Sequence, residues 1–369
     1  MKKLRILHVT FDMAIGGTEQ VIRQLVLNLP AAEFDNEIFC IDGKIGAIGE
    51  QLQQQGIRIH QASRKGGLDF VLIKTLRQIL FNGEFDVVHC HQYTPWVYGW
   101  FAAWGCKAKV VFTEHGRFFP DRSRGKAIPL NVLMALTTSA ISAISAATRD
   151  ALARYEWVPK TLVQVVYNGI QPLTVEMSKV SELRSKLGLT DDLLVLGTIA
   201  RLDPVKNQAM MLHAFALVQT EFPNSRLLIV GDGPSRQELE QLTLELGLKE
   251  LVIFTGFINE PVSYLQLMDI YLLSSLTEGT SMTLLEAMNL GKPCVVTSVG
   301  GNPEIVIDKV SGYVTPSNDP GSFANAIKKL LSDTNERNIF GVKGRNIFYE
   351  YFSIERMTVR YKEIYTKGF

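Results

Sequence analysis

Short apolar runs alternate with longer segments of helical periodicity along the whole chain. The runs in the first half predict buried strands near residues 4–10, 36–41, 57–61, 86–91, 109–113, 140–144 and 163–167. Those in the second half predict strands near residues 194–199, 226–231, 251–255, 269–274, 293–297 and 311–314. Helical periodicity lies between the runs, as at residues 17–29, 70–82, 95–104, 147–155 and 178–187. This alternation is typical of the α/β class with doubly wound parallel sheets.

The length of the chain predicts two domains. A chain of 369 residues is too long for one ordinary hydrophobic core. A turn-rich segment at residues 168–172 separates the two series of strands. We therefore expect residues 1–172 to form the first domain and residues 173–352 the second. A last predicted helix, near residues 353–366, either caps the second domain or returns to the first.

Composition and charge narrow the functional class. The net charge is +1, with a slight basic excess in the first half and an acidic one in the second, which fits two domains that face different partners. We expect no nucleic-acid partner. The four cysteines show no metal-ligand spacing and no paired framework, which indicates buried thiols in a reducing compartment. Residues 127–148 are uncharged but rich in Ser and Thr, and they predict a buried helix and strand rather than a membrane span. A cytoplasmic protein is expected.

The segment between the predicted strands 269–274 and 293–297 carries the strongest chemical signal. Glu278 lies in a polar loop, after which Thr280 or Ser281 can cap a helix that contains Glu286. Free backbone N–H groups at a helix start bind phosphate. The two carboxylates accept hydrogen bonds from vicinal diols, which riboses and hexoses both offer. The segment therefore predicts a sugar-nucleotide site.

Several motifs together resemble the retaining glycosyltransferases of family 4. Glu278 and Glu286 are separated by seven residues, Ala-Met-x-x-Gly-x-Pro follows up to residue 293, and Gly-Gly-x-Pro-Glu occupies residues 300–304. The resemblance spans nearly the whole chain. It implies the GT-B fold, in which two Rossmann-like doubly wound domains face each other across a cleft. It also implies that the C-terminal helix, residues 353–369, crosses back to the first domain, while the second domain binds the nucleotide sugar.

The resemblance assigns donor roles to residues of both domains. It places Arg201 and Lys206 on the donor diphosphate, where a bidentate guanidinium and a mobile ammonium group suit phosphate oxygens. Glu286 is implied to hold the ribose, and Glu278 and His115 to orient the transferred sugar. The remaining donor-side residues are Gly17, Thr280, Ser281 and Met282 near the diphosphate and Gly256 and Phe257 near the base. Phe257 as a plain core residue is an equally good interpretation.

Residues of the first domain are candidates for the acceptor side. Gly16 and Glu19 lie in the loop after the first strand, and His91 ends a strand next to the one before His115. His89 is better interpreted as a core histidine. Arg117 begins a basic loop that includes Arg122, Arg124 and Lys126, and Trp96, Trp100 and Trp104 share one helix face. The loop and the stripe would suit a lipid-diphosphate acceptor at the membrane surface, whereas a solvated loop and a core helix are the alternatives.

These residues predict transfer of a hexose-type sugar, with retention, from a UDP- or GDP-linked donor to a glycan or lipid-linked acceptor. No Asp-x-Asp motif or metal-ligand cluster occurs, so we expect neither a metal nor another cofactor. Glu278 is not assigned as a nucleophile, because same-face attack assisted by the leaving phosphate needs none. Bacterial envelope or exopolysaccharide assembly is an association with similar chains. A sugar-nucleotide 2-epimerase of the same fold and a silent partner subunit of a transferase are the alternatives.

Overall fold

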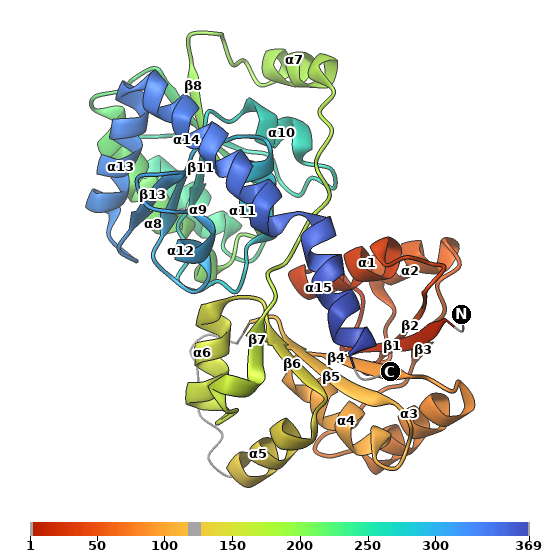
Figure 1. Ribbon diagram of the computed structural model, residues 1–369. Coiled ribbons are helices and arrows are strands. Elements are labelled where there is room, and N and C mark those ends of the chain that lie inside the picture. Colours follow the sequence, from red (N-terminus) through yellow and green to blue (C-terminus); the bar gives the residue numbers. More distant parts are fainter. Residues whose placement is uncertain (1–2, 117–126, 368–369) are drawn as a thin grey trace. The chain divides into compact units, whose positions relative to one another are not determined.

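The computed structural model describes residues 3–116 and 127–367, and the chain divides into two compact units (Figure 1). The first unit extends to Gly169 and includes the C-terminal segment from Ile354 onward. The second unit comprises Ile170–Ser353. Each unit has its own parallel sheet with helices on both faces, so the α/β class and the doubly wound architecture are confirmed.

The first unit contains a seven-stranded parallel sheet in the order β3-β2-β1-β4-β5-β6-β7. Its strands are β1 (Leu4–Thr10), β2 (Phe34–Cys40), β3 (Ile59–Gln61), β4 (Val87–His91), β5 (Lys109–Glu114), β6 (Ala140–Ala143) and β7 (Val163–Val165). Its helices are α1 (Gly17–Asn28), α2 (Gly46–Gln54), α3 (Phe70–Asn82), α4 (Tyr93–Ala103), α5 (Ile128–Thr137), α6 (Ala146–Tyr155), η2 (Lys160–Leu162) and α15 (Ile354–Thr366). The order reverses between β1 and β4, so loops after both strands meet at the edge where such sheets bind ligands.

The second unit contains a six-stranded parallel sheet in the order β10-β9-β8-β11-β12-β13. Its strands are β8 (Leu194–Ile199), β9 (Ser225–Val230), β10 (Val252–Phe254), β11 (Ile270–Leu273), β12 (Cys294–Thr297) and β13 (Gly312–Thr315). Its helices are α7 (Met177–Lys186), η3 (Pro204–Lys206), α8 (Gln208–Gln219), α9 (Arg236–Glu245), α10 (Val262–Leu267), α11 (Met282–Asn289), α12 (Asn302–Ile305), α13 (Pro320–Ser332), α14 (Thr334–Ile347) and η4 (Phe348–Phe352). All the strands predicted from the apolar runs are present, within two residues at either end.

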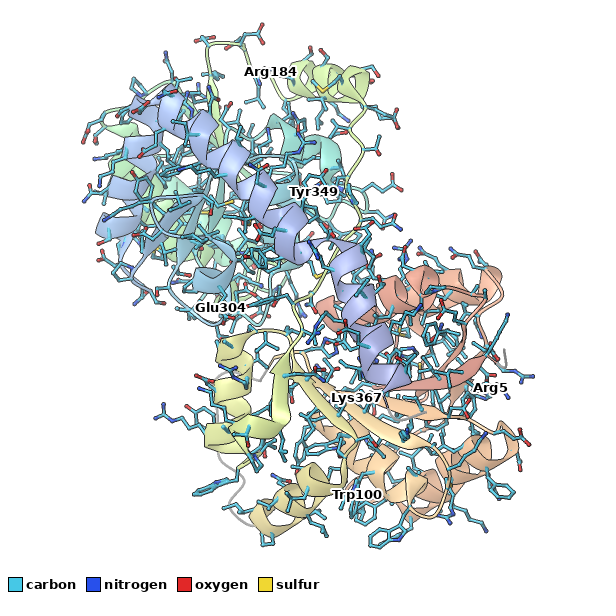
Figure 2. All side chains as sticks on the ribbon, viewed as in Figure 1. Arg5, Trp100, Arg184, Glu304, Tyr349 and Lys367 are labelled. Atoms are coloured by element: carbon cyan, nitrogen blue, oxygen red, sulfur yellow. The ribbon has the colours of Figure 1, made fainter. Side chains whose placement is uncertain are left out.

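The C-terminal helix α15 packs on the first unit, as the resemblance implied. Its Tyr365 hydroxyl lies 2.7 Å from His89 Nδ1, and its Tyr361 hydroxyl lies 3.1 Å from Thr113 Oγ1. Both tyrosines are buried. The helix is followed by Lys367 (Figure 2), and the Lys367 carbonyl accepts a hydrogen bond from Lys109 Nζ of β5 at 3.5 Å. The alternative, a helix that caps the second unit, is wrong.

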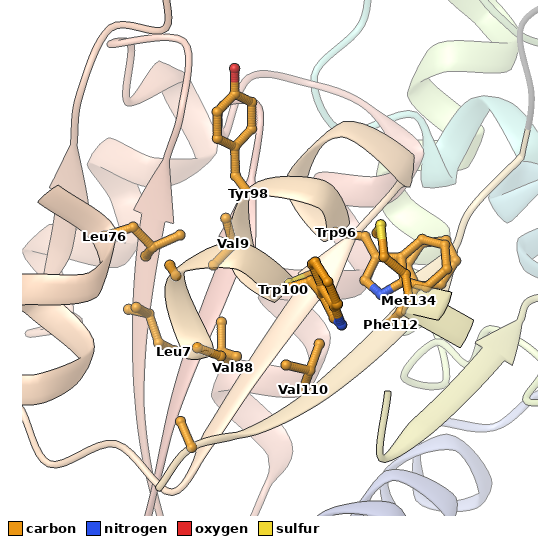
Figure 3. Packing of buried hydrophobic residues seen from close by; sticks show 14 of the residues in the cluster. Leu7, Val9, Leu76, Val88, Trp96, Tyr98, Trp100, Val110, Phe112 and Met134 are labelled. Atoms are coloured by element: carbon orange, nitrogen blue, oxygen red, sulfur yellow. The ribbon is translucent and has the colours of Figure 1, made fainter. Parts of the chain in front are cut away.

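Of the three tryptophans on and just after α4, Trp96 and Trp100 belong to the core of the first unit (Figure 3). Trp96 stacks on Phe112 with ring centroids 4.2 Å apart. Its Nε1 donates to Thr138 Oγ1 at 3.0 Å, and Trp100 Nε1 donates to Thr137 Oγ1 at 2.8 Å. The interpretation of this stripe as a docking face is therefore wrong for two of the three rings, and only Trp104 is exposed. None of the described helices is long and apolar enough to cross a membrane.

The buried hydroxyl of Tyr365 provides a test of the α15 interface. We expect Tyr365→Phe to lower the free energy of unfolding by about 1–3 kcal/mol, because His89 Nδ1 loses its buried partner. Lys362→Ala is the matched control on the same helix, since it removes only an ion pair to Glu33 in which both side chains are largely exposed. That change should cost about 0–1 kcal/mol. Equal losses in urea unfolding of the two variants would contradict the packing described here.

Candidate functional site

The start of α11 offers a phosphate-binding group in the second unit. Ser281 caps the helix, and its Oγ accepts a hydrogen bond from the backbone N–H of Leu284 at 3.4 Å. The first-turn N–H groups of Met282 and Thr283 have no carbonyl partner within a helix. They carry the positive end of the helix dipole, which attracts anions. The cap predicted at residues 280–281 is thus confirmed for Ser281, and Gly291 ends the segment with a φ of 70°.

The structure brings Lys206 and Glu278 together in the loops after β8 and β11. Lys206 Nζ lies 2.6 Å from Glu278 Oε1, and the Ser275 hydroxyl donates to the same oxygen at 2.6 Å. The Glu278 side chain is 8% exposed, so the ion pair is well shielded from water. The Lys206 carbonyl in turn accepts a hydrogen bond from the Ser274 hydroxyl at 2.9 Å. A ligand phosphate near Lys206 would therefore meet an ammonium group that is already fixed in position.

The glycine pair at residues 300–301 supports the loop that contains Glu278. Gly300 has a φ of 49°, and a Cβ atom there would overlap the carbonyl oxygen of Glu278. The backbone N–H of Gly301 donates to the same carbonyl at 3.3 Å. The Gly-Gly motif thus permits a close backbone approach that no larger residue would allow.

Glu286 lies on α11 with a carboxylate that has no partner among the described residues. Its side chain is partly buried, and burial raises its pKa to about 7. An unpaired carboxylate in such surroundings gains free energy when it accepts hydrogen bonds from a ligand. The ribose diol that the resemblance places here would supply them.

Arg201 is not part of the Lys206–Glu278 pair. Its side chain is 72% exposed, with the guanidinium 3.9 Å from the Asp203 carboxylate. The loop around it is fixed through its backbone, because Gly231 and Gly233 pack against the carbonyls of Ala200 and Leu202. The glycines of this turn are therefore structural, and the guanidinium itself points into solvent.

The loop after β10 presents Gly256 and Phe257. Gly256 has a φ of 75°, and its carbonyl accepts a hydrogen bond from Gly231 N at 3.0 Å. Phe257 is 59% exposed, so the interpretation as a plain core residue is wrong. An exposed aromatic ring beside fixed backbone can cover the face of a nucleotide base.

Gly16 and Gly17 begin α1 in the first unit. A Cβ atom on Gly16 would overlap the Glu19 carboxylate, whereas one on Gly17 would meet nothing within 4 Å. Burial raises the pKa of Glu19 to about 7, and its own backbone N–H and the nearby Asp12 modify this value. The two glycines thus differ: Gly16 leaves room for Glu19, while Gly17 leaves an open approach to the helix start.

Four histidines gather at the ends and middle of β1, β4 and β5. His89 is a satisfied core residue, as expected, with Tyr365 and Thr113 Oγ1 each 2.7 Å from one of its ring nitrogens. His91 is completely buried between His8 and His115, so it does not present a free ring to solvent. His115 is partly buried and its Nδ1 has no hydrogen-bond partner among the described residues.

Sequence reasoning missed His8, which lies in the middle of β1. Its only signal is the register of the sheet, which pairs His8 with His89 of β4. The ligand atoms of His8, His89 and His91 lie within 4.8 Å of one another. Every ring nitrogen of these three residues already has a hydrogen-bond partner, so the cluster is a hydrogen-bonded network. Arg117 and the rest of the predicted basic loop lie outside the described residues.

Two family models match the chain, one in each half. The model described as Glycosyltransferase Family 4 matches residues 15–172, and that described as Glycosyl transferases group 1 matches residues 179–347. The motifs of the α11 region and the Gly16–Gly17 pair fall within these matches.

Similar proteins and structures cover almost the whole chain. The UDP-Gal:alpha-D-GlcNAc-diphosphoundecaprenol alpha-1,3-galactosyltransferase of Escherichia coli is 26% identical, over 98% of this chain and 97% of that protein. The N-acetyl-alpha-D-glucosaminyl L-malate synthase of Bacillus anthracis is 28% identical over the same shares. Anabaena Alr3699/HepE, whose structure contains UDP, superposes with a TM-score of 0.85 at 24% identity, over 98% of this chain and 99% of that one. This last likeness shows the fold.

The raised pKa of Glu286 makes stability depend on pH. A carboxyl group with a higher pKa in the folded state stabilises the fold below its ordinary value of 4.5, and this contribution is lost as the pH rises through about 7. We therefore expect Glu286→Gln to raise the free energy of unfolding at pH 8 by about 1–3 kcal/mol, with little change at pH 5. The exposed Glu250→Gln control should change neither value by more than about 0.5 kcal/mol in urea unfolding. A Glu286→Gln variant that is less stable at pH 8 would contradict the buried, unpaired carboxylate.

Proposed function

Because the chain belongs to the group 1, family 4 glycosyltransferases, we propose that it transfers a hexose-type sugar from a nucleotide-diphosphate donor with retention of configuration. The observation that carries this proposal is the arrangement in the second unit. A fixed ammonium group, a helix start and an unpaired carboxylate come from the loops and helix that follow neighbouring strands β8 and β11. These three groups match a diphosphate and a ribose diol.

The donor diphosphate binds, in this proposal, to Lys206 and to the backbone at residues 280–282. Negative charge grows on the diphosphate as the glycosidic bond breaks. Lys206 and the helix dipole of α11 offset that charge, and the exposed Arg201 side chain can turn from solvent to add a second cation. Gly17 supplies its backbone N–H group from the first unit. This set of charges needs no metal ion.

The sugar and the nucleoside have separate partners in this proposal. Glu278 and His115 orient the transferred sugar, and Glu286 holds the ribose. Gly256 and Phe257 border the base. The Escherichia coli relative is named for UDP-galactose, which favours a UDP-linked hexose as the donor here.

Retention is proposed to proceed by attack on the same face that the diphosphate leaves. Lys206 and Ser275 both bind Oε1 of Glu278, which suits a carboxylate that orients hydroxyl groups. In this proposal the leaving phosphate, and not a protein nucleophile, assists the incoming hydroxyl.

The acceptor is proposed to be a glycan or a lipid-linked sugar of bacterial envelope or polysaccharide assembly. The Escherichia coli relative is named for a diphosphoundecaprenol acceptor. Gly16 and Glu19 lie on the acceptor side in this proposal. The exposed Trp104 and Leu136 give the first unit apolar side chains for peripheral contact with the inner face of the cytoplasmic membrane.

Thermal unfolding of the whole chain with a panel of sugar nucleotides tests the donor site. A donor that binds only the folded state stabilises it by about 2.7 kcal/mol at a hundredfold excess over its Kd. We expect one UDP-hexose to raise the Tm, and Lys206→Ala to abolish the shift. Lys328→Ala, which removes another lysine from an ion pair in the same unit, should leave the shift intact. An undiminished shift in Lys206→Ala would overturn the diphosphate assignment.

Transfer assays separate the transferase from the 2-epimerase of the same fold. With donor and acceptor, we expect a product whose anomeric proton coupling matches that of the donor. A new sugar nucleotide formed without acceptor would identify an epimerase instead.

Gly17→Ala tests the approach of the donor to the start of α1. The new methyl group meets nothing within 4 Å, so we expect an unchanged Tm. It would stand between the backbone and a bound phosphate, and kcat/KM for the donor should fall about tenfold or more, a loss of about 1.4 kcal/mol. Unchanged kinetics would remove Gly17 from the donor site.

A further inference from the structure

Three imidazoles and one amide form a continuous hydrogen-bonded chain inside the first unit. Asn36 Oδ1 lies 3.2 Å from His8 Nε2, and His8 Nδ1 lies 3.0 Å from His91 Nε2. His91 Nδ1 lies 2.8 Å from His115 Nε2. The chain ends at His115 Nδ1, a buried atom without a partner among the described residues.

All three imidazoles of this chain are neutral near pH 7. Burial lowers the pKa of His8 to about 4 and that of His115 to about 3. Burial also holds the pKa of His91 well below its ordinary value, and the neighbouring histidines lower it further. A neutral imidazole has one nitrogen that donates and one that accepts. Each bond of the chain therefore fixes the direction of the next.

The amide of Asn36 sets that direction. Its carbonyl oxygen can only accept, so His8 carries its proton on Nε2 and leaves Nδ1 as an acceptor. His91 must then donate from Nε2 to His8 and accept at Nδ1. His115 must donate from Nε2 to His91. Its Nδ1 is left with a lone pair.

We propose that Asn36, His8 and His91 are positioning residues that lock His115 in the Nε2–H tautomer, so that its free Nδ1 accepts a hydrogen bond from a sugar hydroxyl. The binding of a sugar hydroxyl to Nδ1 rests on the proposed function, whereas the tautomer lock itself does not. The hydroxyl donates a hydrogen bond to Nδ1 and keeps its proton, and no proton passes along the chain. A donor nitrogen at the same place would require the hydroxyl to turn its lone pair toward the ring.

His89 is outside the lock although its ring lies next to the chain. Its centroid is 4.0 Å from that of His91, but its nitrogens bind Tyr365 and Thr113. Removal of the Tyr365 hydroxyl therefore perturbs the same cluster without touching the chain. Tyr365→Phe is accordingly a matched control.

The tautomers can be read by long-range ¹H–¹⁵N NMR on the full chain labelled with ¹⁵N-histidine at pH 8. The sequence contains six histidines, and His115→Gln identifies the signals of His115. We expect the unprotonated nitrogen of His115 to be Nδ1 in the wild type. Asn36→Asp replaces the amide, which can also present its NH2 group, by a carboxylate that only accepts hydrogen bonds. This variant should give the same His115 signals as the wild type. Asn36→Leu removes the acceptor, and it should give averaged signals from both tautomers.

The outcomes separate the lock from the transferase assignment. A protonated Nδ1 in the wild type, altered His115 signals in Asn36→Asp or unaltered ones in Asn36→Leu would each overturn the lock. Changed His115 signals in Tyr365→Phe would do so as well. These spectra need no substrate, so they stand even if no donor is turned over.

Kinetics then test what the lock contributes to transfer. Asn36→Leu leaves only a fraction of the molecules with an accepting Nδ1, so kcat/KM for the donor should fall at least about twofold. A kcat/KM equal to that of the wild type, together with averaged His115 signals, would show that the accepting Nδ1 does not serve the reaction.

Discussion

Parallel pairing brings the carboxyl ends of all strands in a sheet to one edge, and the candidate site residues that the structure describes depend on this constraint. In the first unit, Gly17, His91 and His115 follow or end neighbouring strands β1, β4 and β5. In the second unit, Lys206 and Glu278 follow the neighbouring strands β8 and β11. The strand order reverses at both of these places, which is where open α/β sheets bind ligands. The helices then add backbone N–H groups at the same edge.

Burial and hydrogen bonding distinguish the polar side chains at these sheet edges from one another. The Glu278 carboxylate binds both Lys206 and Ser275, whereas Glu286 has no partner among the described residues and burial raises its pKa. The same contrast separates His89, with both nitrogens satisfied, from His115, with one left open. Unsatisfied groups in a folded protein are costly. Their presence at the strand ends, rather than in the core, is consistent with groups that a ligand completes.

The fold could be predicted because its signals are local. Apolar runs and helical periodicity located the strands, and the cap at Ser281 was visible in a few residues. The role of the Trp stripe was harder to predict. The spacing shows that the rings share a helix face, but not that the threonines at the end of α5 bind two of them.

The rest of the site depends on contacts between distant residues. Lys206 and Glu278 are 72 positions apart, and both were predicted as ligand-binding residues without any sign that they bind each other. His8 and His91 are 83 positions apart and meet only through the register of β1 and β4. Whether a side chain is exposed also depends on residues that are distant in the sequence. For this reason the sequence could not distinguish Phe257 from a core residue.

The structure of the complex with UDP tests the donor site most directly. We expect phosphate oxygens at about 3 Å from Lys206 Nζ and from first-turn N–H groups of α11, with the ribose diol on the Glu286 carboxylate. UDP bound with its ribose away from Glu286 and its phosphates away from Lys206 would contradict it.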